Sequence, residues 1–294
     1  MIIDMRNRPP VGQYLSYFAE MIPESRRPEA HLKASMDLWF KEMKSAGITQ
    51  CVAAGGSNPG MVLGKKTIPP RCIENGYVVE VQNKWPERII GCGGIDPSGF
   101  YHDPVKEVEK CHKLGLKGVF MEPGRAWLGS RLNDARLYPI YQKCSELGMF
   151  INPQTSGPLG GDNIDWANPK YVDQVAGDFP DLTIICCHGC YPYLLEIASV
   201  CLRREHVYTC PDLYIKIAGS GLYVETANAT FNIGAKGPIS DKIIFGTAYP
   251  YANMKEYTEW FLRLPLKDDV KEKILYKNAI RAMKLDESKY PTSW

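Results

Sequence analysis

The 294-residue chain has no long apolar run and no strongly charged segment, and both absences exclude classes of function. No stretch approaches the ~18 apolar residues of a membrane-spanning helix, and the N-terminus lacks the basic and apolar regions of a signal peptide. The net charge is only +2, without a Lys/Arg run, so neither nucleic acid nor an acidic membrane surface is supported as a partner. We expect a cytoplasmic protein that binds neither.

The two Cys-x-x-Cys pairs that form a zinc ribbon are also missing, although the chain contains 10 cysteines. We expect most of these cysteines to be reduced and buried as small apolar residues. No glycine-rich phosphate loop of the dinucleotide type occurs. The sequence therefore predicts no cofactor.

Short apolar segments alternate with segments of helical period along the whole chain. This pattern predicts a (β/α)8 TIM barrel in one domain, residues 1–294. Strands are expected at the N-terminus and at 48–54, 89–94, 118–121, 149–153, 182–187, around 207 and at 242–245. Helices are expected at 31–46, 75–85, 105–114, 137–147, 169–179, 193–203, 224–232, 255–264 and 270–283.

Two connections stand out from this alternation. Residues 11–29 contain two prolines and three aromatic residues and are too long for a simple barrel turn. We expect an irregular lid over the barrel mouth. Residues 213–217 are expected to extend the seventh strand.

The first strand ends in a cluster of polar side chains. Asp4, Arg6 and Arg8 fall on one side by the two-residue period of a strand, which Pro9 and Pro10 then stop. Chemistry in such barrels lies at the carboxyl ends of the strands, and a guanidinium offers two parallel donors to a carboxylate. The arginines therefore predict an anion site, or alternatively they pair with acids and hold the barrel together.

Several segments resemble the amidohydrolase-related branch that contains the carboxymuconate-semialdehyde and resorcylate decarboxylases. Their order and spacing carry the resemblance: 1–4, 115–124, Asn-Pro-Lys-Tyr-Val at 168–172, Asp-Phe-Pro-Asp-Leu at 178–182, Cys-His-Gly at 187–189, 242–250 and Asn-Ala at 278–279. The resemblance implies a (β/α)8 barrel that acts on small organic acids, amides or lactones. It also implies a homodimer, which is frequent in this group.

The family's metal ligands are mostly replaced in this chain. Its usual Asp-x-His-x-His becomes Asp4-Met5-Arg6-Asn7-Arg8, the fifth-strand histidine falls at Gln154, and the eighth-strand aspartate is Ala248. Arginine stays protonated and alanine has no donor atom, so we expect no metal. A different site built from Cys186, His188 and Cys190 is a weaker alternative.

The remaining groups suggest how chemistry could proceed without metal. His188, at the end of the sixth strand, is the expected general acid or base, with Glu122 or Asp212 as the carboxylate. The alternatives are that His188 is only a hydrogen-bonded relic and that each carboxylate only neutralises Arg6 or Arg8.

Other side chains are expected around the same mouth or away from it. Gln154 and Tyr249 are predicted to hydrogen-bond the substrate, and Trp127 and Arg125 to cap the pocket. Cys187 is predicted to point toward the outer helices, and the histidines at positions 31, 102, 112 and 206 to be solvated.

Our main prediction is a metal-independent hydrolase that acts on a small carboxylated substrate held by Arg6 and Arg8. A decarboxylase or hydratase type of lyase is the second reading, in which the arginines stabilise an enolate-like intermediate. A barrel that has lost catalysis and binds a metabolite is the third.

Overall fold

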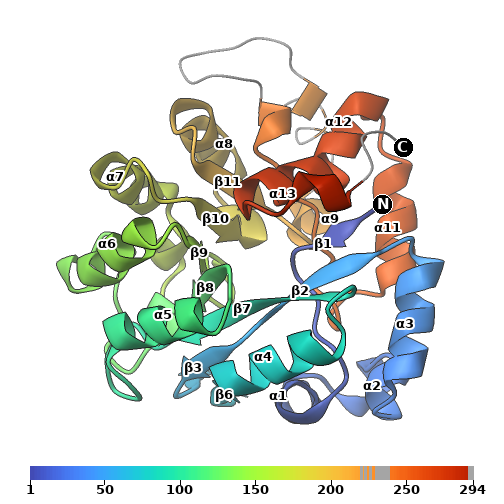
Figure 1. Ribbon diagram of the computed structural model, residues 1–294, viewed down its shortest axis with the longest axis horizontal. Coiled ribbons are helices and arrows are strands. Elements are labelled where there is room, and N and C mark those ends of the chain that lie inside the picture. Colours follow the sequence, from blue (N-terminus) through green and yellow to red (C-terminus); the bar gives the residue numbers. More distant parts are fainter. Residues whose placement is uncertain (219–220, 222–223, 225–226, 229–238, 291–294) are drawn as a thin grey trace.

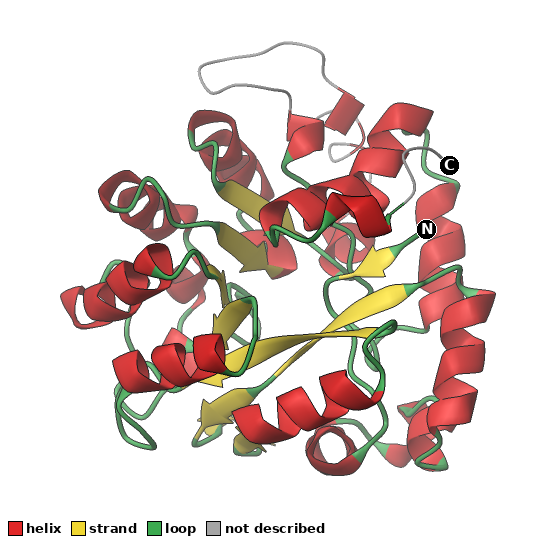
Figure 2. Cartoon of the chain, in the orientation of Figure 1, coloured by secondary structure: helices red, strands yellow, loops and turns green. Residues whose placement is uncertain are grey.

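Parallel strands form the centre of the molecule, and helices surround them (Figures 1 and 2). The computed structural model describes residues 1–290 except 219–220, 222–223, 225–226 and 229–238. Its main sheet has seven strands in the order β1-β2-β7-β8-β9-β10-β11, and all neighbouring strands run parallel. The strands are β1 Ile3–Asp4, β2 Gln50–Ala54, β7 Ile89–Ile95, β8 Gly118–Met121, β9 Phe150–Pro153, β10 Ile184–Cys187 and β11 Val207–Cys210.

Residues 242–245 occupy the eighth position and close the sheet into a barrel. They make an isolated bridge from Ile243 to Thr209 rather than a regular strand. The Thr209 N–H donates to the Lys242 carbonyl at 2.9 Å, and the Met5 N–H donates to the Phe245 carbonyl at 3.0 Å. The predicted TIM barrel is therefore confirmed, with an irregular eighth strand.

Helices follow the strands as expected. They are α2 Glu29–Leu32, α3 Met36–Ser45, α4 Asn75–Lys84, α5 Pro104–Lys113, α6 Tyr138–Glu146, α7 Pro169–Asp178, α8 Leu194–Arg203, α11 Met254–Leu262, α12 Asp268–Glu272 and α13 Asn278–Ala282. A π-helical turn, Lys273–Lys277, joins the last two. The sequence sets such ends locally: the Asp103 carboxylate accepts from two N–H groups at the start of α5, where proline also suits the first turn. No helix in the described part of the chain is long and apolar enough to cross a membrane.

Two small antiparallel pairs of strands are inserted after β2, between it and α4. One pairs β3 Gly56–Asn58 with β6 Arg71–Ile73, and the other pairs β4 Met61–Leu63 with β5 Lys66–Ile68. Gly94 lets the first hairpin approach the barrel, since a Cβ there would lie 2.1 Å from the Gly56 nitrogen. The hairpins bring Arg71 toward the barrel mouth.

Two local predictions were wrong, and one lies largely outside the described residues. Residues 11–29 are not irregular, because Gly12–Met21 forms helix α1, and residues 213–217 enter helix α9 (Tyr214–Ala218) rather than a strand. Both segments carry apolar residues that pack at the barrel mouth. Hydrophobic periodicity alone does not distinguish such a short helix from a strand or an irregular segment. The helix predicted over 224–232 falls mostly outside the described residues.

A small second core lies beside the main one. Tyr17, Phe18 and Met21 of α1 pack with Ile22 and with Ile68 of β5. This cluster ties α1 to the inserted hairpin over the barrel mouth. Helix α1 therefore covers part of this face. Its role as a lid stays a prediction.

Three of the four histidines predicted to be solvated instead anchor the chain. The ring of His31 is buried and its Nε2 lies 3.2 Å from the Arg8 carbonyl. His102 Nε2 accepts from the Asp96 N–H at 2.9 Å, and His206 Nε2 lies 3.1 Å from the Ala176 carbonyl. His112 is exposed, as expected, whereas backbone groups contact the rings of the other three.

Candidate active site

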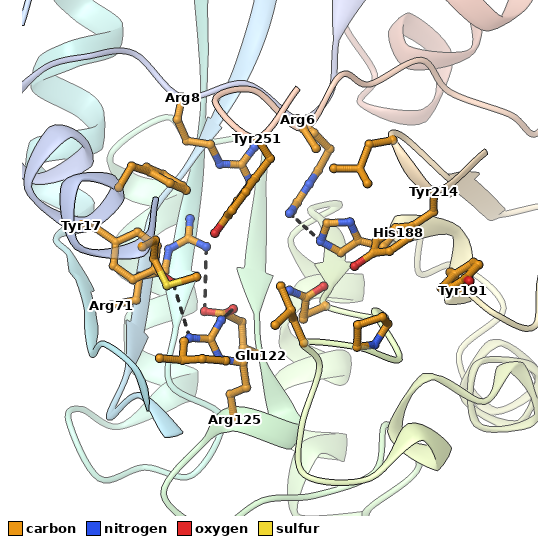
Figure 3. A pocket seen from close by; sticks show the side chains of 18 of the residues that line it. Arg6, Arg8, Tyr17, Arg71, Glu122, Arg125, His188, Tyr191, Tyr214 and Tyr251 are labelled. Atoms are coloured by element: carbon orange, nitrogen blue, oxygen red, sulfur yellow. Dashed lines mark hydrogen bonds and ion pairs between the residues drawn. The ribbon is translucent and has the colours of Figure 1, made fainter. Parts of the chain in front are cut away.

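A cavity of about 460 Å³ lies at the carboxyl ends of the barrel strands (Figure 3). Residues that follow four different strand positions line it: Arg6 and Arg8, Glu122 and Arg125, Gln154, and His188. The β6 strand adds Arg71. Helix α1 contributes Tyr17, Phe18 and Met21, and further apolar wall comes from Ile68, Leu159, Tyr191, Leu213, Tyr214, Ile217 and Tyr251. The cavity is therefore a cationic chamber with an aromatic and aliphatic wall.

His188 lies between a carboxylate, that of Asp212, and a guanidinium, that of Arg6. Its Nδ1 lies 2.7 Å from Asp212 Oδ2, and its Nε2 lies 2.8 Å from Arg6 Nη2. A guanidinium only donates, so Nε2 must accept, and the ring proton sits on Nδ1 toward Asp212. Burial lowers the pKa of His188, Asp212 opposes this, and the Arg6 and Arg8 charges lower it further. The resting imidazole is therefore neutral.

The chain leaves the strands in strained conformations at this site. His188, Asp212 and Ala248 all have positive φ, at 62°, 44° and 61°. This region costs energy for residues other than glycine and is concentrated at functional sites. The three positions follow the sixth, seventh and eighth strand positions, so the strain gathers at one end of the barrel.

Cys187 points into the barrel, which corrects its predicted outward orientation. Its Sγ accepts from Arg6 Nη1 at 3.1 Å and donates to Asn152 Oδ1 at 2.8 Å. The simple alternation fails because His188 turns out of the strand with positive φ and reaches the same mouth. Burial raises the pKa of Cys187 although Arg6 and Arg8 oppose it, so the thiol is neutral and serves to hold Arg6.

The Arg8 guanidinium is buried without an ion pair to any described residue. Its side chain makes no hydrogen bond to the described residues, and its guanidinium carbon lies 6.0 Å from the centre of the Phe18 ring. Burial and the neighbouring charges of Arg6 and Arg71 lower its pKa to about 9. An uncompensated buried cation is unfavourable unless an anion joins it.

Glu122 is already paired with arginines. Its Oε1 lies 2.7 Å from Arg125 Nη1 and its Oε2 lies 3.9 Å from Arg71 Nη1. The Asn58 amide also donates to Oε2 in a short contact. Burial alone would raise the pKa of Glu122, but the charges of Arg125, Arg71 and Arg6 outweigh it and hold the pKa below its usual range. These contacts favour a charge-balancing role over proton transfer, and its partners are Arg125 and Arg71 instead of Arg6 and Arg8.

The structure brings together most of the residues expected at the site. Arg6, Arg8, Glu122, Gln154 and His188 line the cavity, and Asp212 contacts His188 from behind. The Gln154 Oε1 has no partner among the described residues, which leaves an acceptor for a ligand.

Two expected substrate contacts do not reach the cavity. Tyr249 is fully buried and its ring packs on His31 with centroids 5.4 Å apart, while Trp127 is 60% exposed and stacks on Phe100 at 4.7 Å. Tyr249 is turned away directly after Ala248, whose positive φ redirects the chain. Tyr251 lines the cavity in its place.

Sequence reasoning missed Arg71 and gave Arg125 only a capping role. Arg71 lies over the Phe120 ring at 4.8 Å and donates to the Ala54 carbonyl at 3.0 Å. Arg71 lies in an inserted hairpin and not at the end of a barrel strand, so the sequence pattern of the barrel does not indicate it. Arg125 follows β8 and is 95% buried, so it forms part of the wall instead of a cap.

The side chains at the site do not suit a divalent metal. Two arginines, a glutamine and an alanine stand at the ligand positions, and only His188 offers a lone pair of the required kind. The neighbouring Cys190 thiol and burial both raise the pKa of the Cys186 thiol, so Cys186 does not offer a thiolate. Within the described residues, no three His, Cys, Asp or Glu side chains gather as a metal site.

Comparisons with known proteins agree with this architecture. The model of the family described as "Amidohydrolase" matches residues 31–285. A 2-amino-3-carboxymuconate-6-semialdehyde decarboxylase from Dictyostelium discoideum is 26% identical over 260 residues, which are 74% of this chain and 67% of that protein. The structure of an uncharacterized TIM-barrel protein from Bordetella bronchiseptica is 32% identical, with a TM-score of 0.82 over 97% of this chain and 98% of that one.

More distant solved structures share the fold. A dihydroxybenzoic acid decarboxylase from Polaromonas, with bound manganese and 2-nitroresorcinol, is 17% identical, with a TM-score of 0.67 over 99% of both chains. Because the family model covers most of the sequence and the barrel matches over nearly its whole length, the chain belongs to the amidohydrolase family.

Proposed function

We propose that the chain is a metal-independent lyase that decarboxylates a small organic acid. The observation that carries this proposal is a cluster of buried arginines around one imidazole at the carboxyl ends of the barrel strands. The decarboxylase named among its relatives supports the reaction class. The aromatic and aliphatic wall suits a ring or an unsaturated skeleton.

The residues at the site can supply each part of such a reaction. Breaking the bond between carbon and the carboxylate releases CO₂ and leaves the electron pair on the substrate, where Arg6 and Arg8 stabilise it through a conjugated oxygen. His188 then delivers a proton from Nε2 to the carbon, so one proton is consumed for each CO₂ released.

Asp212 makes this proton transfer possible. A bound anion adds negative charge beside His188 and raises its pKa, while Asp212 stabilises the imidazolium through Nδ1. Arg6, which donates to Nε2 in the free protein, turns its donor to the substrate. Gln154 accepts a hydrogen bond from a substrate hydroxyl.

Chelation tests the metal-free claim. After exhaustive dialysis against a chelator, we expect CO₂ release from a panel of hydroxybenzoic and unsaturated carboxylic acids to persist, because no step uses a metal. Elemental mass spectrometry checks that metal is far below one equivalent, and a coupled assay measures CO₂. Loss of activity that manganese or zinc restores would contradict the proposal, and tight binding without product would favour a metabolite-binding barrel.

Hydrolysis of a lactone or amide is the second candidate, and the resting tautomer favours it. The Nε2 lone pair of neutral His188 can take a proton from water, and the arginines can stabilise the oxyanion that follows. The two reactions require opposite protonation states of the same imidazole.

The pH profile of kcat/KM separates the two candidates. The pKa of His188 in the free protein is lowered from 6.5. Hydrolysis needs the neutral base, so kcat/KM should rise as pH increases through that lowered pKa and stay level at neutral pH. Decarboxylation needs the protonated acid, so kcat/KM should fall over the same range. The profile measured on the first substrate found decides between them.

A further inference from the structure

The cavity carries more positive charge than one carboxylate would balance. Its described wall contains the guanidinium groups of Arg6, Arg8, Arg71 and Arg125 but a single carboxylate, Glu122. Behind the wall, Asp212 lies 3.7 Å from Arg6 Nε and offsets that charge. The single negative charge of Glu122 is shared by Arg125 and Arg71, so it offsets one of their two positive charges. Two guanidinium groups therefore remain uncompensated by the described residues.

Asp4 does not supply the missing charge at the cavity. Its carboxylate accepts from the Thr247 N–H at 2.9 Å, from the Thr247 hydroxyl at 2.6 Å and from the Asn7 amide at 2.9 Å. It is fully buried and does not line the cavity. Burial raises the pKa of Asp4, and the Asp4 charge acts on Arg8 less than the repulsion from Arg6 and Arg71 does. The uncompensated charge must be met by what the cavity binds.

The arginines stand at two ends of one chamber. Arg6 contacts His188, Cys187 and Asp212, whereas Arg71 contacts Glu122 and the Ala54 carbonyl. In Figure 3, Arg8 reaches between them. The Phe120 ring lies under both ends, 5.6 Å from the Arg6 guanidinium carbon and 4.8 Å from that of Arg71. The two carbons are thus no farther apart than the sum of these distances, which a ligand with one ring can span.

We propose that the substrate is a dianion, with two anionic groups on one ring-sized skeleton. The reacting group lies beside His188 and Arg6, the second group is anchored by Arg71, and Arg8 contacts both. Arg71 is then the residue that selects dianions over monoanions. This inference rests on the proposed function, because it places an organic acid in this cavity.

Matched ligands test the proposal without requiring turnover. Calorimetry of the full chain would compare the three benzenedicarboxylates with their monomethyl esters, which have nearly the same shape and one charge fewer. We expect at least one dicarboxylate to bind about 10²-fold more tightly than its ester, as a buried charge pair predicts. Equal affinity within all three pairs would overturn the proposal.

Variants of Arg71 locate the second subsite. Arg71→Gln should reduce the affinity for the preferred dicarboxylate to that of its ester while leaving the ester unchanged, and Arg71→Lys should keep much of the preference. Arg136, which is exposed and paired with Asp134, provides the control Arg136→Gln, with no expected change. Equal weakening of dicarboxylate and ester by Arg71→Gln would overturn the assignment. A retained dianion preference without CO₂ release would contradict only the proposed reaction.

Discussion

Replacing His188 by asparagine is expected to lower kcat by about 10²- to 10⁴-fold, the usual contribution of a positioned acid or base. The imidazole is the only side chain at the cavity that both exchanges a proton near neutral pH and contacts a buried carboxylate, within the described residues. Asparagine preserves a polar group of similar reach but cannot carry the proton. Steady-state kinetics on the first substrate identified would measure the loss.

The KM should change much less than kcat, because the arginines bind the anion. His112→Asn is the matched control, since His112 is exposed and lies near the opposite end of the barrel strands. We expect it to leave kcat and KM unchanged. A His188→Asn protein that keeps more than about a tenth of its kcat would contradict the role of His188 as the proton donor or acceptor.

Replacing Arg8 by methionine is expected to change binding and stability in opposite directions. The buried Arg8 cation has no acid partner among the described residues and is repelled by Arg6 and Arg71. Methionine of similar length should raise the free energy of unfolding of the ligand-free protein by about 1–4 kcal/mol. The same change should weaken carboxylate binding by about 10²-fold or more. Urea unfolding and calorimetry would measure the two effects.

Arg6→Met provides a control with the opposite effect on stability. Arg6 donates to Cys187 and His188 and lies beside Asp212, so its loss leaves buried polar groups without a partner. We expect a loss of about 3–5 kcal/mol in the free energy of unfolding. If Arg8→Met also destabilised the protein, Arg8 would have a structural role and the anion-binding argument would fail.

Both predictions concern residues that were expected at the site because they follow the carboxyl ends of barrel strands. Arg6, Arg8 and Gln154 reach the cavity because they follow barrel strands, and the carboxyl ends of parallel strands meet at one face. His188 reaches the cavity as well. Its positive φ breaks the alternation of side chains along the strand, which is why the predicted orientation of Cys187 was wrong. The eighth-strand region shows the limit of the rule, because Tyr249 turns into the core and Tyr251 lines the cavity.

The amino-acid sequence by itself determined the barrel and one half of the site. Its helical and two-residue periods are local, so β8 falls at the expected residues 118–121 and α7 begins at the expected Pro169. The replacement of metal ligands at Arg6, Arg8, Gln154 and Ala248 follows from the family resemblance and from residue type, and the absence of a metal stays a prediction.

Only the tertiary structure decided the other half. Arg71 arrives from an inserted hairpin, Tyr17 and Phe18 arrive from α1, and Glu122 pairs with Arg125 and Arg71. These contacts join segments far apart in the sequence, and no local period records such a distance. Charge balance is likewise a property of the assembled cavity: Arg8 is a surplus cation because folding buries it beside other arginines without an ion pair to a described acid.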